Sequence, residues 1–379
     1  MEFSYSREQE LVKKMLRDFA ENEIQPITDE IDENASYPYE TIAKLGQLGV
    51  MGMPFPAEYG GAGSDYLTYI MAVEEISKVC ASHGVIVQTH NALCCWPIFT
   101  YGTEEQKRKY LPKLLSGEHL GAFGLTEPNA GTDAAMQQTT AKDMGDHWLL
   151  NGSKIFISGG GIADVYVVMA MTDKSKGNKG ISSFIVEKGM PGFSRGKKEN
   201  KMGIRGSVAA ELVFEDCIVP KENLLGPLGK GFKVAMSSLD VGRLGIAAQA
   251  LGIAQGAFDQ TVTYMKQRKQ FGRSLDRFQA LAFEMANMKT RIDGSRFLLY
   301  NAANRRDRGL SSTVEAAQAK LSCSETASYV VDKAVQFHGG YGYIKDYPVE
   351  RMYRDQKITE IYEGTSEVMK MVISGAIFK

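Results

Sequence analysis

Residues 147–157 read HWLLNGSKIFI, two apolar runs on either side of Asn151-Gly152. Asn-Gly between apolar runs is typical of a type I′ hairpin turn, because that turn needs positive φ at both central positions. Further apolar runs follow at residues 164–171, 181–186 and 211–214, separated by turns rich in Gly, Lys and Asn. Strands at this spacing predict a β-barrel or sandwich rather than alternating βαβ units.

The sequence before this β segment has helical character. Ser6 and Gln9 form a predicted capping box just ahead of an amphipathic stretch that begins at Leu11. Clusters of Gly and Pro then punctuate the segment, notably at residues 59–63. The first region is therefore expected to be a helical domain of residues 1–120.

The sequence after the β segment is helical again. Residues 232–268 predict one long helix, in which Gly252 and Gly256 permit a second helix to pack closely. Ser312 and Glu315 predict another capping box, opening a helix that ends near residues 339–340. We therefore expect an α+β protein with a central β domain, residues 121–230, and a C-terminal helical domain, residues 231–379.

Composition excludes several classes of protein. The 379 residues contain 44 Lys and Arg against 45 Asp and Glu, a net charge of −1, which argues against a protein that binds nucleic acid through excess positive charge. The first residues lack the basic and apolar regions of a signal peptide, and no apolar run reaches about 20 residues, so we expect neither a signal peptide nor a membrane segment. Five scattered cysteines without a C-x-x-C pair favour a reduced, cytoplasmic protein.

Common catalytic motifs are missing from the sequence. It has no P-loop, no G-x-G-x-x-G after a strand and no G-x-S-x-G elbow. The five histidines have no metal-ligand spacing, so no metal is expected. These observations argue against kinases, hydrolases and metalloenzymes.

Two polar, glycine-bearing stretches remain as candidates for a ligand-binding or catalytic site. Residues 125–133, LTEPNAGTD, offer backbone N–H groups and hydroxyls suited to a cofactor or an anion, although the residues alone favour a plain connecting loop. Residues 336–343, QFHGGYGY, lead on to residues 362–365, YEGT, where Glu363 adjoins a glycine at a predicted break between helices. A desolvated carboxylate there acts as a general base, but from the residues alone Glu363 is one of 45 acidic side chains.

Together these two stretches resemble the signatures of the acyl-CoA dehydrogenase family, and the resemblance covers essentially the whole chain. It is nearest to the short-chain, butyryl-CoA dehydrogenase branch of anaerobic bacteria. The resemblance implies that family's fold, with an N-terminal helical domain, a central β-barrel or sandwich and a C-terminal four-helix bundle. It also implies FAD bound without a Rossmann motif, and a homotetramer in which some residues reach a neighbouring subunit's FAD.

By this resemblance, residues 123–132 wrap the isoalloxazine ring and residues 156–158 lie against its other side. Many relatives have Trp where this chain has Phe156, so an aromatic face is kept. Arg268, Phe271 and residues 336–340 are implied to hold the pyrophosphate and adenine end. The implied FAD-binding residues are Phe123, Leu125, Thr126, Gly131, Thr132, Phe156, Ile157, Ser158, Arg268, Phe271, Gln279, Gln336, Phe337, Gly339, Gly340, Thr365, Ser366 and Glu367.

The same resemblance makes Glu363 the catalytic base. Removing the weakly acidic α-proton of a thioester needs a dry carboxylate with a raised pKa. The Glu363 N–H and a flavin ribityl hydroxyl are implied to polarise the thioester carbonyl. Some branches place the base on the long helix, at the position of Gly242 here, which has no side chain and so favours Glu363.

The implied substrate contacts are Thr132, Asp240, Arg243 and Gly364. Asp240 and Arg243 lie three apart on a helix, so an internal ion pair explains them equally well. Residues 88–96 are expected to close the floor of the acyl pocket. Within this segment His90, Cys94 and Cys95 are candidates, each as well suited to an ordinary core.

The expected function is FAD-dependent α,β-dehydrogenation of a short-chain acyl-CoA, butyryl-CoA to crotonyl-CoA or the reverse, with an electron-transferring flavoprotein as electron partner. An aromatic enoyl-CoA reductase of the caffeyl or phenylpropenoyl type, in an electron-bifurcating complex, is the alternative within the family. An oxidase that passes electrons to oxygen is disfavoured by the short chain. A non-catalytic acyl-CoA-binding scaffold is disfavoured because it has no use for a buried carboxylate.

Overall fold

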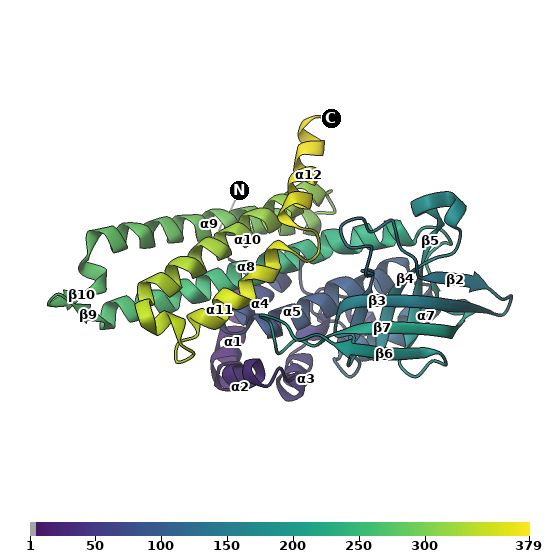
Figure 1. The fold of residues 1–379 in the computed structure, drawn as a ribbon, viewed down its shortest axis with the longest axis horizontal. Helices are drawn as coiled ribbons and strands as arrows, with labels where there is room; N and C mark the ends of the chain where they lie inside the picture. The colour runs from purple at the N-terminus through teal and green to yellow at the C-terminus, as the bar shows by residue number, and fades with distance from the viewer. Residues whose placement is uncertain (1–4) are drawn as a thin grey trace.

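The computed structural model describes residues 5–379 and shows a helical region, a β region and a second helical region in chain order (Figure 1). The strands of the large sheet gather at one end of the molecule, the long C-terminal helices extend away from them, and a separate two-stranded sheet lies at the opposite end. This confirms the predicted α+β architecture and its order.

The N-terminal region begins at the predicted capping box. The Ser6 Oγ accepts a hydrogen bond from the Gln9 N–H at 3.1 Å, and the Gln9 side chain accepts one from the Ser6 N–H at 3.0 Å. One segment, η5 (His90–Cys95), is a π-helix, a geometry often found at functional sites. The helices are α1 (Arg7–Phe19), α2 (Thr28–Glu33), α3 (Tyr39–Gln47), α4 (Tyr66–Val79), α5 (Ala81–Thr89), α6 (Trp96–Tyr101) and α7 (Glu104–Leu115).

The β region is one mixed sheet that folds on itself. Its order is β6-β7-β3-β2-β4-β5-β8, with β1 parallel to β4, and the halves containing β3 and β4 meet through one residue pair, Thr140 with Met171. Trp148 and Phe214 from one half share an apolar core with Tyr166 and Phe184 from the other, as expected for a barrel or sandwich. The strands are β1 (Gly121–Gly124), β2 (Thr140–Asp143), β3 (His147–Ser158), β4 (Val165–Met171), β5 (Ile181–Glu187), β6 (Phe193–Lys198), β7 (Ala209–Pro220) and β8 (Leu224–Leu225).

The hairpin predicted at Asn151-Gly152 is wrong. Both residues lie inside β3, at an irregularity in its pairing with β7, and the turn before β3 lies instead around Gly145. Asn151 exchanges two hydrogen bonds with Asp216 on β7, at 3.0 and 2.9 Å. A Cβ on Gly152 would lie 2.6 Å from the Thr139 Oγ1. The Asn-Gly signal therefore marks a bulge with a close backbone approach rather than a turn.

The C-terminal region is built around α8, a single helix of 37 residues, as predicted. A Cβ on Gly252 would lie 2.5 Å from the Glu74 carbonyl oxygen, and one on Gly256 would lie 2.2 Å from that of Lys78. The two glycines therefore allow the close packing of α4 on α8 that their spacing predicted. The elements of this region are α8 (Gly231–Gln267), β9 (Lys269–Gln270), β10 (Arg273–Ser274), α9 (Gln279–Asp307), α10 (Thr313–His338), α11 (Val349–Gln356) and α12 (Ser366–Ile377).

The capping box predicted at Ser312 and Glu315 is also wrong, although α10 begins where it was expected. The Ser312 side chain makes no capping hydrogen bond, because its backbone, with ψ near 13°, is not extended as a capping residue requires. Glu315 instead forms an ion pair with Arg305 at 3.1 Å.

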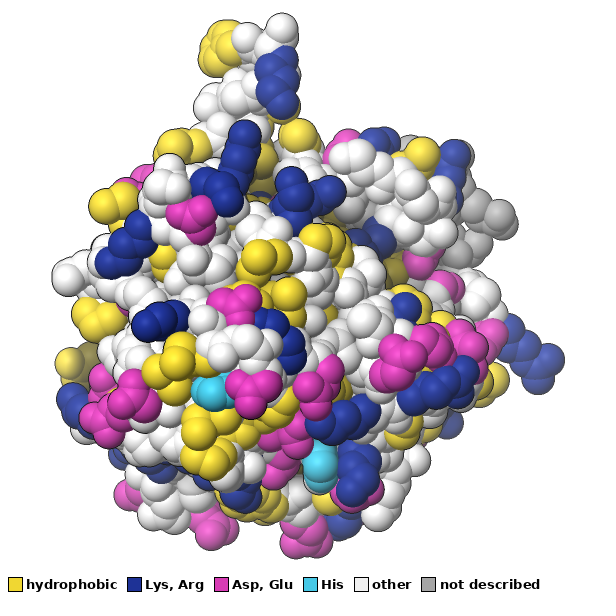
Figure 2. Space-filling view, turned by 90° about the vertical axis from the view of Figure 1, so that its right-hand side faces the viewer, with side chains coloured by type: hydrophobic (Ala, Val, Ile, Leu, Met, Phe, Trp, Pro, Cys, Tyr) yellow, Lys and Arg dark blue, Asp and Glu magenta, His cyan; other side chains and the backbone are white. Residues whose placement is uncertain are grey.

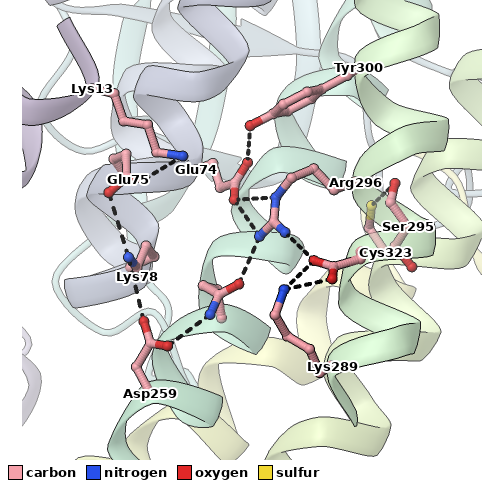
Figure 3. Close-up of polar contacts among 12 residues, drawn as sticks. Lys13, Glu74, Glu75, Lys78, Asp259, Lys289, Ser295, Arg296, Tyr300 and Cys323 are labelled. Atoms are coloured by element: carbon pink, nitrogen blue, oxygen red, sulfur yellow. Dashed lines mark hydrogen bonds and ion pairs between the residues drawn. The ribbon is translucent and has the colours of Figure 1, made fainter. Parts of the chain in front are cut away.

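A buried network of charges ties α4 to α8 and α9 (Figure 3). The Glu74 carboxylate accepts hydrogen bonds from the Arg296 guanidinium at 2.9 and 3.0 Å and from the Tyr300 hydroxyl at 2.8 Å. Arg296 also donates to Gln255 on α8 at 2.8 Å. The N-terminal and C-terminal helices therefore form one packed unit.

The end of the molecule that carries the sheet has a mixed surface, on which basic, acidic and apolar side chains interleave (Figure 2). Within residues 5–379, no helix is both long and apolar enough to cross a membrane.

Candidate active site

Glu363 lies where the chain turns between two helices, as the sequence predicted. A 3₁₀ turn at Lys357–Glu360 precedes it, and α12 begins three residues after it. Glu363 and Gly364 both have positive φ, of 54° and 100°. A non-glycine residue in this conformation is strained and is held only by the structure around it. This turn directs the Glu363 side chain inward, toward α5 and α8.

One oxygen of the Glu363 carboxylate is held and the other is not. The Gln88 amide nitrogen, from α5, donates to Oε1 at 2.8 Å. Oε2 is buried and has no hydrogen-bond partner among the described residues. A Cβ on Gly242 of α8 would lie only 2.0 Å from Oε2, so only a glycine leaves room for the carboxylate in this position.

Gln88 is itself fixed against α8. Its amide nitrogen also donates to the Gly242 carbonyl oxygen at 2.9 Å. A Cβ on Gly245 would lie 2.0 Å from the Gln88 Cγ. Two glycines one turn apart on α8 therefore make room for Gln88 and for the carboxylate that it holds.

Burial raises the pKa of Glu363 to about 7. The Gln88 hydrogen bond, and the charges of Lys320 and Arg243, oppose this rise by favouring the ionised form. A carboxylate with this pKa both takes up and releases a proton near neutral pH, which is what a general base requires.

Two cations hold the backbone of the Glu363 turn. The Arg243 Nε donates to the Glu363 carbonyl oxygen at 3.2 Å, and the Lys320 Nζ donates to that of Gly364 at 2.6 Å. Arg243 also pairs with Asp240 at 2.7 Å, so the ion pair expected from their spacing is present. Sequence reasoning missed Lys320; its position among apolar residues of a predicted helix was the available signal.

The loop at residues 125–133 is fastened to β3 by a second buried lysine that sequence reasoning missed. The Lys154 Nζ donates to the Leu125 carbonyl oxygen at 3.1 Å, to Glu127 at 2.6 Å and to Gln137 at 2.8 Å. The Thr126 carbonyl oxygen accepts from the Ile155 N–H at 2.9 Å. The first set of predicted FAD residues, from the loop and from β3, is therefore brought together.

Phe156 projects from β3 next to the loop at residues 125–133. It lies at a second irregularity of β3, has a positive φ of 58°, and is 63% exposed. Gly131 and Thr132 are exposed on the loop, whereas Phe123, Leu125 and Ile157 are buried beneath the surface. Ser158 is partly buried at the end of β3. An exposed aromatic ring beside an open polar loop is suited to stacking against a planar ligand.

The second set of predicted FAD residues lies elsewhere. Arg268, Gln336, Phe337, Gly339 and Gly340 line a groove of about 560 Å³ at the far end of the long helices. Phe271 is almost fully exposed next to it, and Gln279, also exposed, begins α9. Arg268 follows Arg243 by 25 helical residues, about 37 Å along α8. One chain therefore does not gather both sets in one place (Figure 1).

The start of α12 lies next to Glu363. The Thr365 Oγ1 caps this helix by accepting from the Val368 N–H at 3.3 Å. The Ser366 Oγ is buried and has no partner among the described residues. Glu367 is exposed, and the backbone N–H at the helix start lowers its pKa.

The candidates for the acyl pocket floor have structural contacts. The His90 Nδ1 accepts from the Gly121 N–H at 3.1 Å, and its Nε2 lies 2.9 Å from the Leu114 carbonyl oxygen. Burial lowers the pKa of His90 to about 4, so its ring is neutral at physiological pH. Cys94 and Cys95 are fully buried in the core. Within the described residues, no group of three His, Cys, Asp or Glu side chains is placed to hold a metal ion.

Family models for the three acyl-CoA dehydrogenase domains match the chain in order: the N-terminal domain at residues 6–118, the middle domain at 122–217 and the C-terminal domain at 229–378. The chain is 62% identical to the short-chain specific acyl-CoA dehydrogenase of Clostridium acetobutylicum, over the full length of both proteins. It is 47% identical to the caffeyl-CoA reductase-Etf complex subunit CarC of Acetobacterium woodii, with 99% of each chain covered.

Two solved structures are nearly superimposable on it. Butyryl-CoA dehydrogenase of Megasphaera elsdenii matches with a TM-score of 0.98 and 51% identity, over all of both chains. A chain from a structure described as the electron transferring flavoprotein of Acidaminococcus fermentans, in work on flavin-based electron bifurcation, matches with a TM-score of 0.99 and 54% identity, again over all of both chains. Three domain models in order, together with this identity over the full length, show that the chain belongs to the acyl-CoA dehydrogenase family.

Proposed function

We propose that this protein catalyses the FAD-dependent interconversion of a short-chain acyl-CoA and its trans-2-enoyl-CoA, with butyryl-CoA and crotonyl-CoA as the reference pair. The observation that carries the proposal is the Glu363 carboxylate, which is buried, has a pKa raised to about 7 and has one oxygen that no described residue binds. Full-length relatives and solved structures that are named for short-chain acyl-CoA or butyryl-CoA dehydrogenases support the choice of substrate.

The residues present fit FAD. Phe156 offers an exposed ring, the loop at residues 125–133 offers polar groups, and the buried Ser366 Oγ has no hydrogen-bond partner within residues 5–379. In the distant groove, the Arg268 guanidinium beside Gly339 and Gly340 suits a diphosphate, because glycines let backbone N–H groups approach a ligand. FAD, when bound, accepts the hydride from the β-carbon of the acyl group. The electron partner would be an electron-transferring flavoprotein, as in the complex that names the relative from Acetobacterium woodii.

The chain supplies the proton chemistry. Glu363 removes the α-proton of the thioester, and its ionised form is available once the pH exceeds its pKa of about 7. The Glu363 N–H, which donates to no acceptor within the described residues, is free to bind the thioester oxygen as enolate charge develops. In the reductive direction the protonated Glu363 returns the proton to the α-carbon.

The separation of the two FAD sets supports a homotetramer. The set around Arg268 lies just past the end of α8, beside β9 and β10, whereas the set around Phe156 lies on β3 of the large sheet, so the two are well separated (Figure 1). A second copy that brings its Arg268 groove to the first copy's Phe156 surface completes the site.

An aromatic enoyl-CoA is the second candidate substrate. The 47% identity to the caffeyl-CoA reductase subunit is the observation that favours it. A scaffold without catalytic activity is disfavoured, because Glu363 keeps a costly buried carboxylate in place.

Anaerobic titration of the purified protein with butyryl-CoA, crotonyl-CoA and phenylpropionyl-CoA, followed by flavin absorbance, tests the proposal. Bleaching by butyryl-CoA with a long-wavelength charge-transfer band supports a short-chain dehydrogenase. A flavin that butyryl-CoA leaves oxidised, but that phenylpropionyl-CoA bleaches, moves the assignment to the aromatic reductase. Protein without flavin, or flavin unresponsive to every thioester, refutes the enzyme assignment.

A further inference from the structure

Lys320, on α10, has a fully buried side chain. Among the described residues, the Lys320 side chain makes one hydrogen bond, from its Nζ to the Gly364 carbonyl oxygen at 2.6 Å, and it has no acidic side chain within ion-pair distance. A buried ammonium group costs free energy unless its surroundings compensate for it. The contact that Lys320 does make is with the turn that carries Glu363.

Lys320 and Arg243 act on that turn from two neighbouring helices, α10 and α8. Arg243, from α8, holds the Glu363 carbonyl oxygen, and Lys320, from α10, holds the next carbonyl along the chain. Glu363, with a φ of 54°, is in the left-handed region, which a non-glycine residue keeps only when contacts enforce it, whereas Gly364 takes its φ of 100° freely. Two cations on successive carbonyl oxygens provide such contacts.

We propose that Lys320 is a positioning residue for the catalytic base, with an ammonium group that fixes the Glu363-Gly364 turn and favours the ionised form of the Glu363 carboxylate. The inference rests on the proposed function, since it takes Glu363 as the group that removes the α-proton. It adds a buried cation on a third helix to a site otherwise formed by α5, α8 and the turn itself.

The charges around the pair agree with this role. Lys320 favours the ionised form of Glu363, and it does so from inside the protein, where a charge is weakly screened. Burial lowers the pKa of Lys320 to about 8, so the group is still mostly charged at pH 7. The other charged or titratable groups that act on the pair are Arg243 from α8, Tyr66 and Tyr69 from α4, Glu360 and Tyr362 from the segment before the turn, and Glu367 from α12.

The test replaces Lys320 in the flavin-loaded enzyme. Lys320→Met removes the charge and the donor, Lys320→Arg keeps both, and Lys333→Met makes the same change at a partly exposed lysine on the same helix. An opposite charge nearby shifts a carboxyl pKa by about one unit or more. With a shift of one unit, Lys320→Met moves the acidic limb of kcat/KM from about pH 7 to about pH 8 and lowers kcat/KM at pH 7 about fivefold, with recovery at pH 9. Lys320→Arg and Lys333→Met keep the limb in place.

A second readout needs no turnover. In protein labelled with ¹³C at glutamate carboxyls, the Glu363 signal is the one lost in Glu363→Gln, and its titration reports the pKa directly. An unshifted titration and an unmoved acidic limb in Lys320→Met overturn the inference, as does a loss of activity that is uniform over pH. If Lys320→Met fails to fold, Lys320→Gln, which keeps a donor without the charge, replaces it. Glu363→Gln with wild-type activity refutes the proposed function itself, whatever the Lys320 variants do.

Discussion

Replacing Gly242 by alanine tests the geometry of the site most severely. The added Cβ would lie 2.0 Å from the Glu363 Oε2, 2.8 Å from its Cδ and 3.1 Å from its Oε1. Heavy atoms in contact lie about 3.5 Å apart or more, so the carboxylate must move by at least about 1 Å. That movement breaks the 2.8 Å hydrogen bond from Gln88, which holds Oε1.

A catalytic group displaced by about 1 Å costs on the order of 10²-fold in rate. We therefore expect Gly242→Ala to lower kcat/KM for butyryl-CoA about 100-fold while the protein keeps its flavin. Overpacking of this kind also costs about 1–3 kcal/mol of stability. The assay is anaerobic stopped-flow bleaching of the flavin, together with urea denaturation.

Gly294→Ala is the matched control, because a Cβ at Gly294 of α9 would meet nothing within 4 Å. We expect this variant to keep wild-type kcat/KM and to gain about 0.5–1 kcal/mol of stability, since alanine favours a helix interior over glycine. A Gly242→Ala enzyme with kcat/KM within threefold of wild type would refute the packing of Glu363 against α8.

Three further outcomes follow from the structure. Because folding raises the pKa of Glu363 from about 4.5 to about 7, the native state loses stability as the pH rises through this range. Glu363→Gln should therefore be about 3 kcal/mol more stable than wild type at pH 8 and equally stable at pH 4. Equal stability at both pH values would contradict the burial of the carboxylate. Lys154→Met leaves Glu127 buried without its cation, so it should lower the free energy of unfolding, measured in urea, by about 3 kcal/mol and weaken flavin binding. Adding Glu127→Gln should recover part of the lost stability, and no recovery would argue against the pairing of Lys154 with Glu127. Arg268→Ala should lower the flavin content of the purified protein without moving the acidic limb of kcat/KM, and a full flavin content would remove Arg268 from the cofactor site.

The sequence predicted the fold well where a pattern is local. The long helix of α8, the capping box at Ser6 and the order of the three regions follow from periodicity and capping. Asn151-Gly152 misled because a bulge and a hairpin turn favour the same dipeptide, and only the partner strand decides between them. The capping box predicted at Ser312 failed for a related reason, since the backbone conformation of Ser312 depends on the turn before α10.

Parts of the site were beyond sequence reasoning because they depend on contacts between distant segments. Gln88, Gly242 and Glu363 lie far apart in the chain, and only folding places the amide, the glycine and the carboxylate together. Lys154 and Lys320 resemble surface residues by type, yet both are fully buried and hold the carbonyl oxygens of functional loops. The likeness to a family, rather than periodicity, pointed to Glu363.

The exchange of the α-proton with solvent tests the role of Glu363 as the base most directly. A short-chain acyl-CoA analogue with sulfur at the β-position cannot lose a hydride, so any reaction stops at proton removal. In D₂O, the flavin-loaded wild type should exchange the α-proton at a rate that rises with pH around a midpoint near 7 and levels off at higher pH. Glu363→Gln should bind the analogue and exchange at least about 100-fold more slowly. Exchange by Glu363→Gln within tenfold of the wild-type rate would show that another group is the base.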